Sequence, residues 1–442
     1  MIGKTSQQAS ETATPLAAPA RPIPGRWRYS GGVTLLVLLY CGLWNLAARL
    51  PLNRTDLDAF FLPAVRVALS GHPLDIYTVR FLKIYPNANG PLSLVPLTLA
   101  AAIASWQGWL ADMELRRVVV MTICAPFVLL MAREAVALVD QLRAKRLAGV
   151  WRFAAYALFA LSPGIWHGML FYGHIEQPIM LWLVLAGIRQ LTQRHPARAG
   201  ALLALALLTR TSALMLVLPL AALLVRDRQW PALGRFGGAL VGTVGMLLLP
   251  FLLADGRDVV YSLVTFRSML PVGGGSIWGL TWGTPLEPFG RQYDGVAVLL
   301  AALALSVLVV LRRRDLTLAR PSLYLLLALS SFCFALLIKT LWPYYFLEPF
   351  TMLTIWWLSI MPGALGRFRV WMYWGMAFVL PAVAIACAGI REYGLTLEQT
   401  RGLLKPESIV LTVAMLLAMG TILWLLLARP FQNGYPRYRS NG

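Results

Sequence analysis

Charged residues are scarce in this sequence, and that scarcity excludes an ordinary soluble fold. Of the 442 residues, 13% are charged and 58% are hydrophobic, and the mean hydropathy is +0.66. A soluble domain cannot bury so much apolar surface, and apolar runs of about 20 residues recur throughout. Because only helices and closed barrels satisfy their own backbone polar groups in lipid, each run is expected to be helical. The predicted fold class is therefore an all-α polytopic membrane protein.

Cysteine is also rare, and its spacing excludes two kinds of site. The four cysteines lie in separate apolar stretches without a C-x-x-C pair, and they are Cys41, Cys124, Cys333 and Cys387. This pattern indicates small buried hydrophobes, neither a disulfide framework nor a cysteine metal site. The trio His167, His174 and Glu176 also lacks the spacing of a metal site. We expect no metal and no cofactor.

The N-terminus lacks the apolar core and cleavage site of a signal peptide. Residues 1–28 are rich in Ala, Thr, Ser, Gln and Pro, which is typical of a disordered tail. The first span, from about Gly31 to Leu50, is then an uncleaved anchor that follows a cytoplasmic tail. We expect residues 29–428 to form a single transmembrane domain and residues 429–442 a second, basic cytoplasmic tail.

Acidic residues are outnumbered, with 19 Asp and Glu against 39 Lys and Arg, which gives a net charge of +20. In a soluble chain this excess would suggest nucleic acid. Here the basic residues gather in short loops between apolar runs, as the positive-inside rule predicts, so we expect no nucleic-acid partner. Placing the loops 141–152, 189–198, 226–235, 312–320 and 363–369 in the cytoplasm predicts about twelve spans with both termini inside.

This topology requires two decisions. The apolar stretch 91–111 is expected to be re-entrant or interfacial, and the run 199–225 to break near Thr209-Arg210-Thr211. An arginine within an apolar run is costly in lipid, so Arg210 is expected at a cavity or interface on the outer face. The alternative is a true span over 91–111 and one long tilted helix over 199–225. The long loops 51–117 and 255–295 then face outward, and we expect function there.

Two aspartates directly follow the first span. Thr55 or Asp56 can cap an amphipathic helix whose apolar positions recur at helical spacing from residue 57 to residue 69, and Gly71 can end it. Asp56 lies one turn before Phe60 on the same face. The alternative is that Asp56 is only a helix cap and Asp58 a solvated surface charge.

A series of short motifs follows in order. The first part comprises Asp56, the aromatic Phe60, Tyr77, and Tyr85-Pro86 before Pro91-Leu92. The later motifs are Gly173-His174-Ile175-Glu176-Gln177, Thr209-Arg210-Thr211, Ser276-Ile277-Trp278-Gly279-Leu280 and Trp342-Pro343-Tyr344-Tyr345. In order and spacing, over positions 31 to about 360, the sequence resembles the polyprenol-phosphate-mannose-dependent family of GT-C glycosyltransferases. The mycobacterial phosphatidylinositol-mannoside mannosyltransferases of glycosyltransferase family 87 are members. His174 replaces the usual Gln and Arg210 the usual Lys, so the donor sugar stays open.

The resemblance implies a GT-C-type bundle and an inverting, single-displacement transfer on the outer face of a bacterial inner membrane. A sugar, mannose in this family, would pass from a polyprenyl phosphate to a lipid or glycan acceptor. Asp56 is the expected general base, with Asp58 as the alternative. Arg210 would stabilise the leaving phosphate. The other expected substrate-binding residues are His167, His174, Glu176, Tyr344, Tyr345, Lys339 and Tyr85.

Each of these roles has a plainer alternative. Arg210 could snorkel to lipid headgroups, and Tyr344 and Tyr345 could belong to an interfacial aromatic belt. Gly273-Gly274-Gly275 lacks the strand–turn–helix context of a phosphate loop and is expected to be a flexible hinge. Arg133 and Glu134 inside a span are expected to pair with each other.

A transporter or flippase of lipid-linked sugars is the rival function. Transporters usually carry internal repeats and ionisable residues at the middle of the membrane. This sequence has no convincing repeat, and its ionisable residues are expected at the outer rim. Both features favour the enzyme.

Overall fold

The computed structural model describes residues 39, 42, 56–81, 85–108, 113–143, 145–311, 316–360, 367–393 and 397–427. The two predicted tails lie outside these residues, as does the first span apart from Leu39 and Gly42. The described chain is helical apart from one antiparallel pairing of two short strands, β1 (Arg80–Phe81) and β2 (Tyr85–Pro86). The all-α expectation is therefore confirmed for these residues.

The helices follow one another with short connections. The α-helices are α2 (Leu62–Leu69), α3 (Leu94–Trp106), α4 (Met113–Leu142), α5 (Gly149–Ala160), α6 (Pro163–Trp166), α7 (Glu176–Thr192), α8 (Pro196–Thr209), α9 (Leu214–Arg226), α10 (Trp230–Val260), α11 (Phe266–Met269), α12 (Glu287–Leu311), α13 (Ser322–Leu337), α14 (Leu347–Ile360), α15 (Arg367–Trp374), α16 (Leu380–Tyr393) and α17 (Leu397–Leu427). The π-helical turns are η1 (Leu57–Phe61), η4 (His167–Tyr172), η6 (Tyr261–Thr265) and η9 (Gly375–Val379), and the 3₁₀ turns are η2 (Pro73–Asp75), η3 (Pro91–Ser93), η5 (Thr211–Ala213), η7 (Ile277–Thr281) and η8 (Pro343–Phe346).

Among the described residues, five helical segments are long and apolar enough to cross a membrane. They are Thr122–Leu142, Trp230–Thr265, Glu287–Leu311, Arg369–Ile390 and Gly402–Leu427. Other expected spans are shorter: α8, α9 and α14 have 14, 13 and 14 residues. At 1.5 Å per residue these helices are about 20 Å long, less than the roughly 30 Å apolar core of a bilayer.

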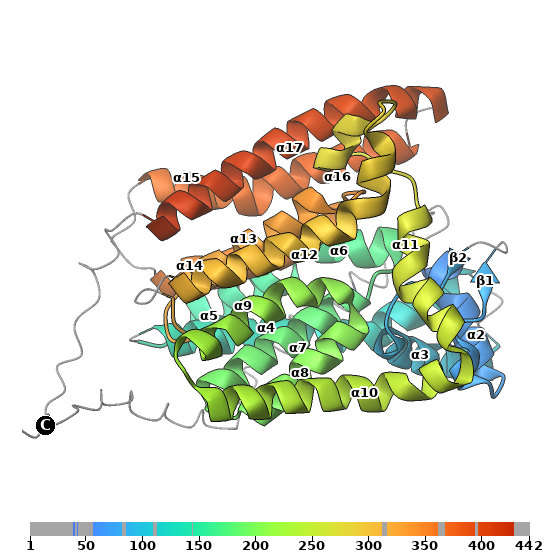
Figure 1. The fold of residues 1–442 in the computed structure, drawn as a ribbon, viewed down its shortest axis with the longest axis horizontal. Coiled ribbons are helices and arrows are strands. Elements are labelled where there is room, and N and C mark those ends of the chain that lie inside the picture. Colours follow the sequence, from blue (N-terminus) through green and yellow to red (C-terminus); the bar gives the residue numbers. More distant parts are fainter. Residues whose placement is uncertain are drawn as a thin grey trace, which may run out of the picture.

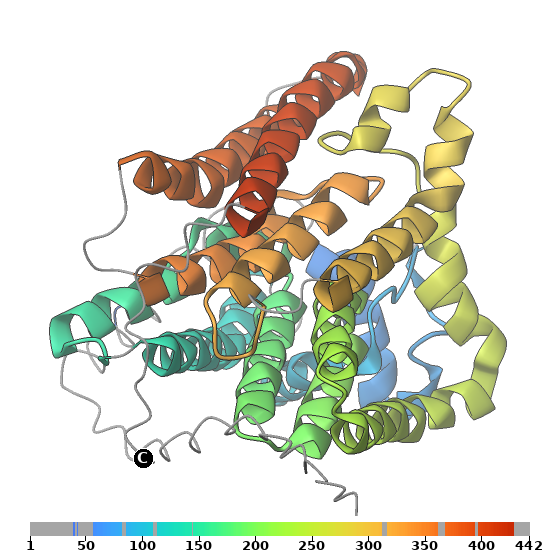
Figure 2. The ribbon, with the colours of Figure 1, turned by 60° about the vertical axis from the view of Figure 1, so that its left-hand side comes forward.

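Most helices run along one axis of the molecule (Figure 1). Helix α8 packs between α7 and α10, and α9 packs against α12. Segments 73–81 and 250–262 lie beside each other in both views (Figures 1 and 2). There, Arg80 forms an ion pair with Asp258 (2.7 Å), and Ser262 Oγ donates to the carbonyl of Tyr77 (3.3 Å). The early loop is thereby fixed to the far part of α10.

The expected break in the run 199–225 is confirmed. Helix α8 ends at Thr209, Arg210 has extended backbone angles (φ −153°, ψ 127°), and η5 leads into α9. The alternative of one long tilted helix is wrong. In the stretch 91–111, the helix α3 covers only 13 residues and packs against α2 and α4. Residues 109–111 lie outside the described residues, and α8 and α9 are equally short, so the re-entrant or interfacial placement of 91–111 stays a prediction.

Two other expectations are wrong. A Cβ on Gly273 would lie 2.5 Å from the Thr340 side chain, and one on Gly274 would lie 2.5 Å from a Glu407 carboxylate oxygen. Glycine serves here for close packing, so this segment is no open hinge. Glu134 pairs with Arg189 of α7 (2.6 and 3.2 Å) and not with its neighbour Arg133, which is exposed on α4.

Candidate functional site

Asp56 begins the helix formed by η1 and α2, as its position predicts. Its side chain makes no capping hydrogen bond. Instead, its Oδ2 lies 2.8 Å from Nε2 of His174, which is 118 residues away in the sequence. The reading of Asp56 as a mere helix cap is therefore wrong. Gly71 ends this segment with a positive φ of 92°, as expected.

A glycine brings His174 to Asp56. Gly173 has a φ of +72°, and a Cβ on it would lie 2.5 Å from the Cβ of Leu57 in η1. Only glycine combines this backbone conformation with so close an approach. The His174 backbone N–H then donates to the carbonyl of Gly168 (3.0 Å), which turns the chain toward α7.

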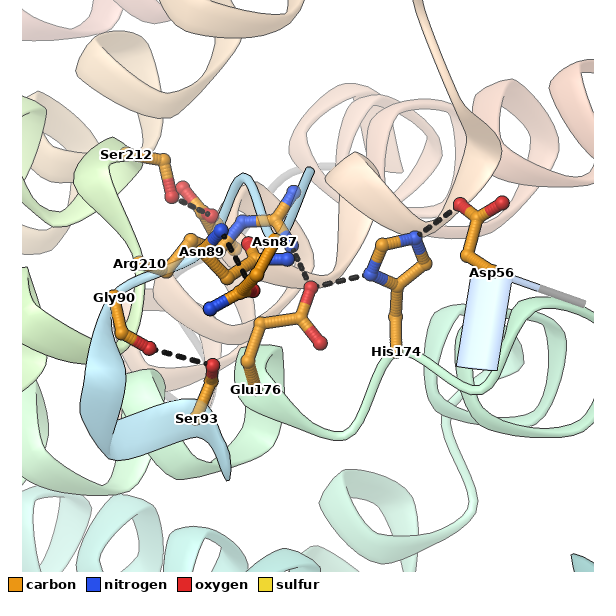
Figure 3. A network of polar contacts seen from close by, with 10 residues as sticks. Asp56, Asn87, Asn89, Gly90, Ser93, His174, Glu176, Arg210 and Ser212 are labelled. Carbon is orange, nitrogen blue, oxygen red and sulfur yellow. Dashed lines mark hydrogen bonds and ion pairs between the residues drawn. The ribbon is translucent and has the colours of Figure 1, made fainter. Parts of the chain in front are cut away.

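Glu176 is the first residue of α7 and is fully buried. A helix N-terminus favours a negative charge, so this position suits a carboxylate. Its Oε1 contacts Nδ1 of His174 and accepts a hydrogen bond from Nη1 of Arg210 (2.5 Å). Asp56, His174, Glu176 and Arg210 thus form one chain of alternating charge, which we call the charge chain (Figure 3).

The contacts of His174 determine its protonation. A neutral imidazole has one donor and one acceptor nitrogen, whereas both nitrogens of His174 face carboxylate oxygens, which only accept. Only a doubly protonated ring can donate to both of these oxygens. Burial alone lowers the pKa of His174, but Glu176 first and Asp56 second outweigh it and raise the pKa to about 9.

The pKa of Glu176 shifts in the opposite direction to that of His174. Burial alone would raise the pKa of Glu176, but the positive charges of His174 and Arg210 outweigh it and hold this pKa below its ordinary value. The charged forms of His174 and Glu176 are thus stabilised by their neighbours in the charge chain.

Tyrosines enclose the charge chain. The Arg210 guanidinium carbon lies 4.9 Å from the ring centre of Tyr345 and 5.5 Å from that of Tyr344, both within cation–π range. The Tyr344 ring lies 4.2 Å from the His174 ring and 5.4 Å from that of Tyr172. Tyr344 and Tyr345 are buried in these contacts, so they are not an exposed interfacial belt.

The snorkelling alternative for Arg210 is also wrong. The residue is only 7% exposed, and its guanidinium is held by Glu176 inside the protein. Its extended backbone between α8 and η5 turns the side chain into this buried site.

The structure adds residues that the motifs did not indicate. Ser212 Oγ donates to Oε1 of the buried Glu348 (2.8 Å), close to Arg210 (Figure 3). Glu348 is a single acid within an apolar run, and an ionisable residue in such a run is itself a sign of function. Asn87 is 2% exposed, and in the described part of the chain its Nδ2 has no hydrogen-bond partner.

The other expected site residues lie around the charge chain or apart from it. The His167 ring, in η4, lies 5.2 Å from that of Tyr172. Asp58 is half-buried on η1, where the contact of His174 goes to Asp56 instead. Tyr85 lies on β2, and its side chain is outside the described residues.

Lys339 belongs to a second polar cluster. Its Nζ donates to the carbonyl of Arg291 (2.7 Å) and lies 3.7 Å from the carboxylate of Asp294 on α12. Its own carbonyl accepts from Ser276 Oγ (3.1 Å). These contacts fix the segment 270–294 to the end of α13. They suit a structural role better than the expected role beside Arg210.

Within the described residues, no group of three or more His, Cys, Asp or Glu side chains is placed to hold a metal ion. Cys124 and Cys333 are buried free thiols. Comparison with known proteins gives no assignment, since no family model matches the chain and a search of the curated proteins finds no significant match.

Proposed function

We propose that the chain is a membrane glycosyltransferase with Asp56 as its general base. It would transfer a sugar, mannose in the family that it resembles, from a polyprenyl phosphate to a lipid or glycan acceptor with inversion. One observation carries this proposal: the Asp56 carboxylate is oriented by His174 at the open end of the charge chain. The Asp56 side chain is 29% exposed, against 9% for His174 and 0% for Glu176.

The chemistry needs few groups. The acceptor hydroxyl gives its proton to Asp56 while its oxygen bonds to the anomeric carbon, and the bond from that carbon to the phosphate oxygen breaks. A positioned carboxylate base typically contributes about 10²–10⁴-fold to such a rate. Figure 3 shows the second carboxylate oxygen of Asp56 turned away from His174, so this oxygen would be the one to take the proton of an acceptor.

The leaving polyprenyl phosphate needs positive charge or fixed donors. Arg210 suits this role although Glu176 already engages its Nη1, because a guanidinium has five N–H donors. Tyr344 and Tyr345, whose rings lie beside Arg210, would supply further hydroxyl donors. Binding a phosphodiester would add an acceptor to Arg210 without requiring a new cation.

The arrangement of the helices supports an outward-facing site. The connections α4–α5, α7–α8, α9–α10 and α12–α13 hold the basic loops, whereas the charge chain comes from η1, the α7 start and the α8–η5 break. With the basic loops in the cytoplasm, the charge chain faces the outer side of a bacterial inner membrane. In this proposal, the short helices would complete a GT-C-type bundle of about twelve membrane helices.

A transporter or flippase of lipid-linked sugars is the second candidate. The observation that favours it is a buried Asp–His–Glu–Arg chain at a break between two helices. Such chains act as proton relays in transporters, and broken helices often form their binding sites.

Sugar transfer by purified protein in lipid vesicles tests both candidates. The donor is radiolabelled polyprenyl-phosphate-mannose and the acceptor a membrane lipid extract. We expect the wild type and Asp58→Asn to make labelled product, and Asp56→Asn to lower the rate by about 10²–10⁴-fold.

Other outcomes would redirect the proposal. Loss of transfer in Asp58→Asn alone would move the base to Asp58. If no extract yields product while the labelled lipid crosses the bilayer, the chain is the transporter.

A further inference from the structure

Glu176 has no access to a substrate. It is 0% exposed, and its Oε1 is shared between His174 and Arg210. The sequence suggested a sugar contact for this residue, but a fully enclosed carboxylate can influence a reaction only through its neighbours. Its neighbour on the side of Asp56 is His174.

Two carboxylates face the ring nitrogens of His174 and influence its charge. The groups that face it are Asp56 from the start of η1 and Glu176 from α7, with the rings of Phe61, Tyr172 and Tyr344 around it. Arg210 lies behind Glu176. Of these groups, the two carboxylates carry the negative charge that favours the imidazolium, and they lie at its two nitrogens.

The imidazolium offers Asp56 a charged donor, which a neutral ring cannot. If His174 were neutral, its single N–H could serve only one carboxylate, and the other would face a nitrogen lone pair. With the Glu176 charge removed and Nδ1–H retained, Nε2 would present its lone pair to Asp56. The 2.8 Å contact that orients Asp56 would become repulsive.

We infer that Glu176 is a positioning residue, which keeps His174 doubly protonated and thereby holds the Asp56 carboxylate in place, while Arg210 fixes Glu176. Only the naming of Asp56 as the base rests on the proposed function. The linkage among the four side chains stands on their contacts alone. No covalent step takes place at Glu176.

Two variants distinguish the effect of the Glu176 charge on His174 from a general loss of stability. Glu176→Gln keeps the shape and removes the charge, but it leaves a buried guanidinium without its partner, which destabilises a fold. The double variant Glu176→Gln/Arg210→Met removes both charges. The control is Glu134→Gln/Arg189→Met, which removes a partly buried ion pair between α4 and α7 (2.6 Å).

The first test measures the protonation of His174 directly. The protein has four histidines, so ¹³C,¹⁵N-histidine labelling in lipid nanodiscs gives few signals, and His174→Gln identifies the one sought. We expect His174 to titrate near pH 9 in the wild type and in the control. In either Glu176 variant its midpoint should fall by roughly 1–3 pH units. An unchanged midpoint in the folded variants would overturn the inference.

The second test follows the transfer rate against pH. In the wild type, kcat/KM should fall on the alkaline side as His174 loses its proton, and in Glu176→Gln this fall should occur at lower pH. A residue that only supports the fold would lower the rate at every pH without moving the alkaline limb, and that result would contradict the inference. The nuclear magnetic resonance test uses no donor, so failure of the proposed transfer would be distinguishable from failure of the linkage.

Discussion

Each charged side chain of the site is matched by an opposite charge from a distant part of the sequence. His174 and Asp56 are 118 residues apart, and Arg210 and Glu176 are 34 residues apart. A buried charge without its partner is costly, so none of these segments is stable in its place alone. The site and the fold around it therefore form together.

Stability should depend on pH through His174. Its pKa is about 9 in the folded protein against 6.5 for an unperturbed histidine, so its contribution is fully present below about pH 6.5. That contribution is lost as pH rises through about 9. We expect the melting temperature of the detergent-solubilised wild type to fall by a few degrees between pH 7 and 10. The fall should be smaller in His174→Gln, and equal falls in both proteins would contradict this assignment.

Single residues were predictable where their type was unusual for their surroundings. Arg210 in an apolar run and Asp56 after the first span both pointed to the site, as did the pair Tyr344 and Tyr345. Their partners were not predictable, because local spacing carries no information on which distant side chain meets another. Lys339 illustrates the limit, since its pairing with Asp294 could not be read from its own motif.

At the scale of helices and turns, the site is assembled where chain segments approach closely. The turn before η3 lies directly on the end of α8: a Cβ on Gly90 would lie 1.7 Å from the carbonyl oxygen of Leu208. Tyr77 also donates its hydroxyl to the carbonyl of Asn89 (3.2 Å). The close approach of Gly90 to Leu208 places this turn two residues before Arg210.

Gly90→Ala should therefore destabilise the protein, because the methyl group meets backbone atoms that cannot rotate away. Overpacking of this kind typically costs about 1–3 kcal/mol. The control is Gly245→Ala in α10, where a Cβ would meet nothing within 4 Å. Thermal unfolding in detergent should show a clear loss for Gly90→Ala and little change for Gly245→Ala. Equal behaviour of the two variants would refute the close approach.

The sequence predicted the break at Arg210 and the end of the first amphipathic helix at Gly71. It did not indicate the π-helical turns η1 and η4, because no spacing of residue types distinguishes them from an α-helix. The triple glycine at 273–275 led to the wrong prediction of a flexible hinge. Glycine serves both flexibility and close packing, and only the neighbours Thr340 and Glu407 decide between these two roles.

Over the whole molecule, the basic connections and the charge chain occupy opposite ends of the helices. This arrangement predicts which loops a membrane-impermeant reagent reaches. His72, whose side chain is 67% exposed, lies between α2 and η2 in the proposed first outer loop, and the exposed Gln229 lies in a basic connection. In a cysteine-free background, His72→Cys should react with an impermeant maleimide on intact cells. Gln229→Cys should react only after permeabilisation, and the reverse pattern would invert the proposed orientation.

The depth of the site follows from the register of α8 against α10. A Cβ on Gly200 would lie 2.1 Å from the carbonyl oxygen of Phe236, so the two helices are level there. Both run toward the early loop, which contacts Leu208 in α8 and Phe251 in α10. Ten residues beyond Gly200, Arg210 is level with about residue 246 of α10.

Helix α10 bends out of helical geometry at Asp255, where its apolar surface gives way to charged residues. At 1.5 Å per residue, this rim lies about 14 Å beyond the level of Arg210. In the proposed transferase, a hydroxyl acceptor would have to reach about this far past the rim to arrive at the level of Arg210. For the proposed transfer, this depth suits a slender head group carried by a lipid better than a folded domain resting on the surface.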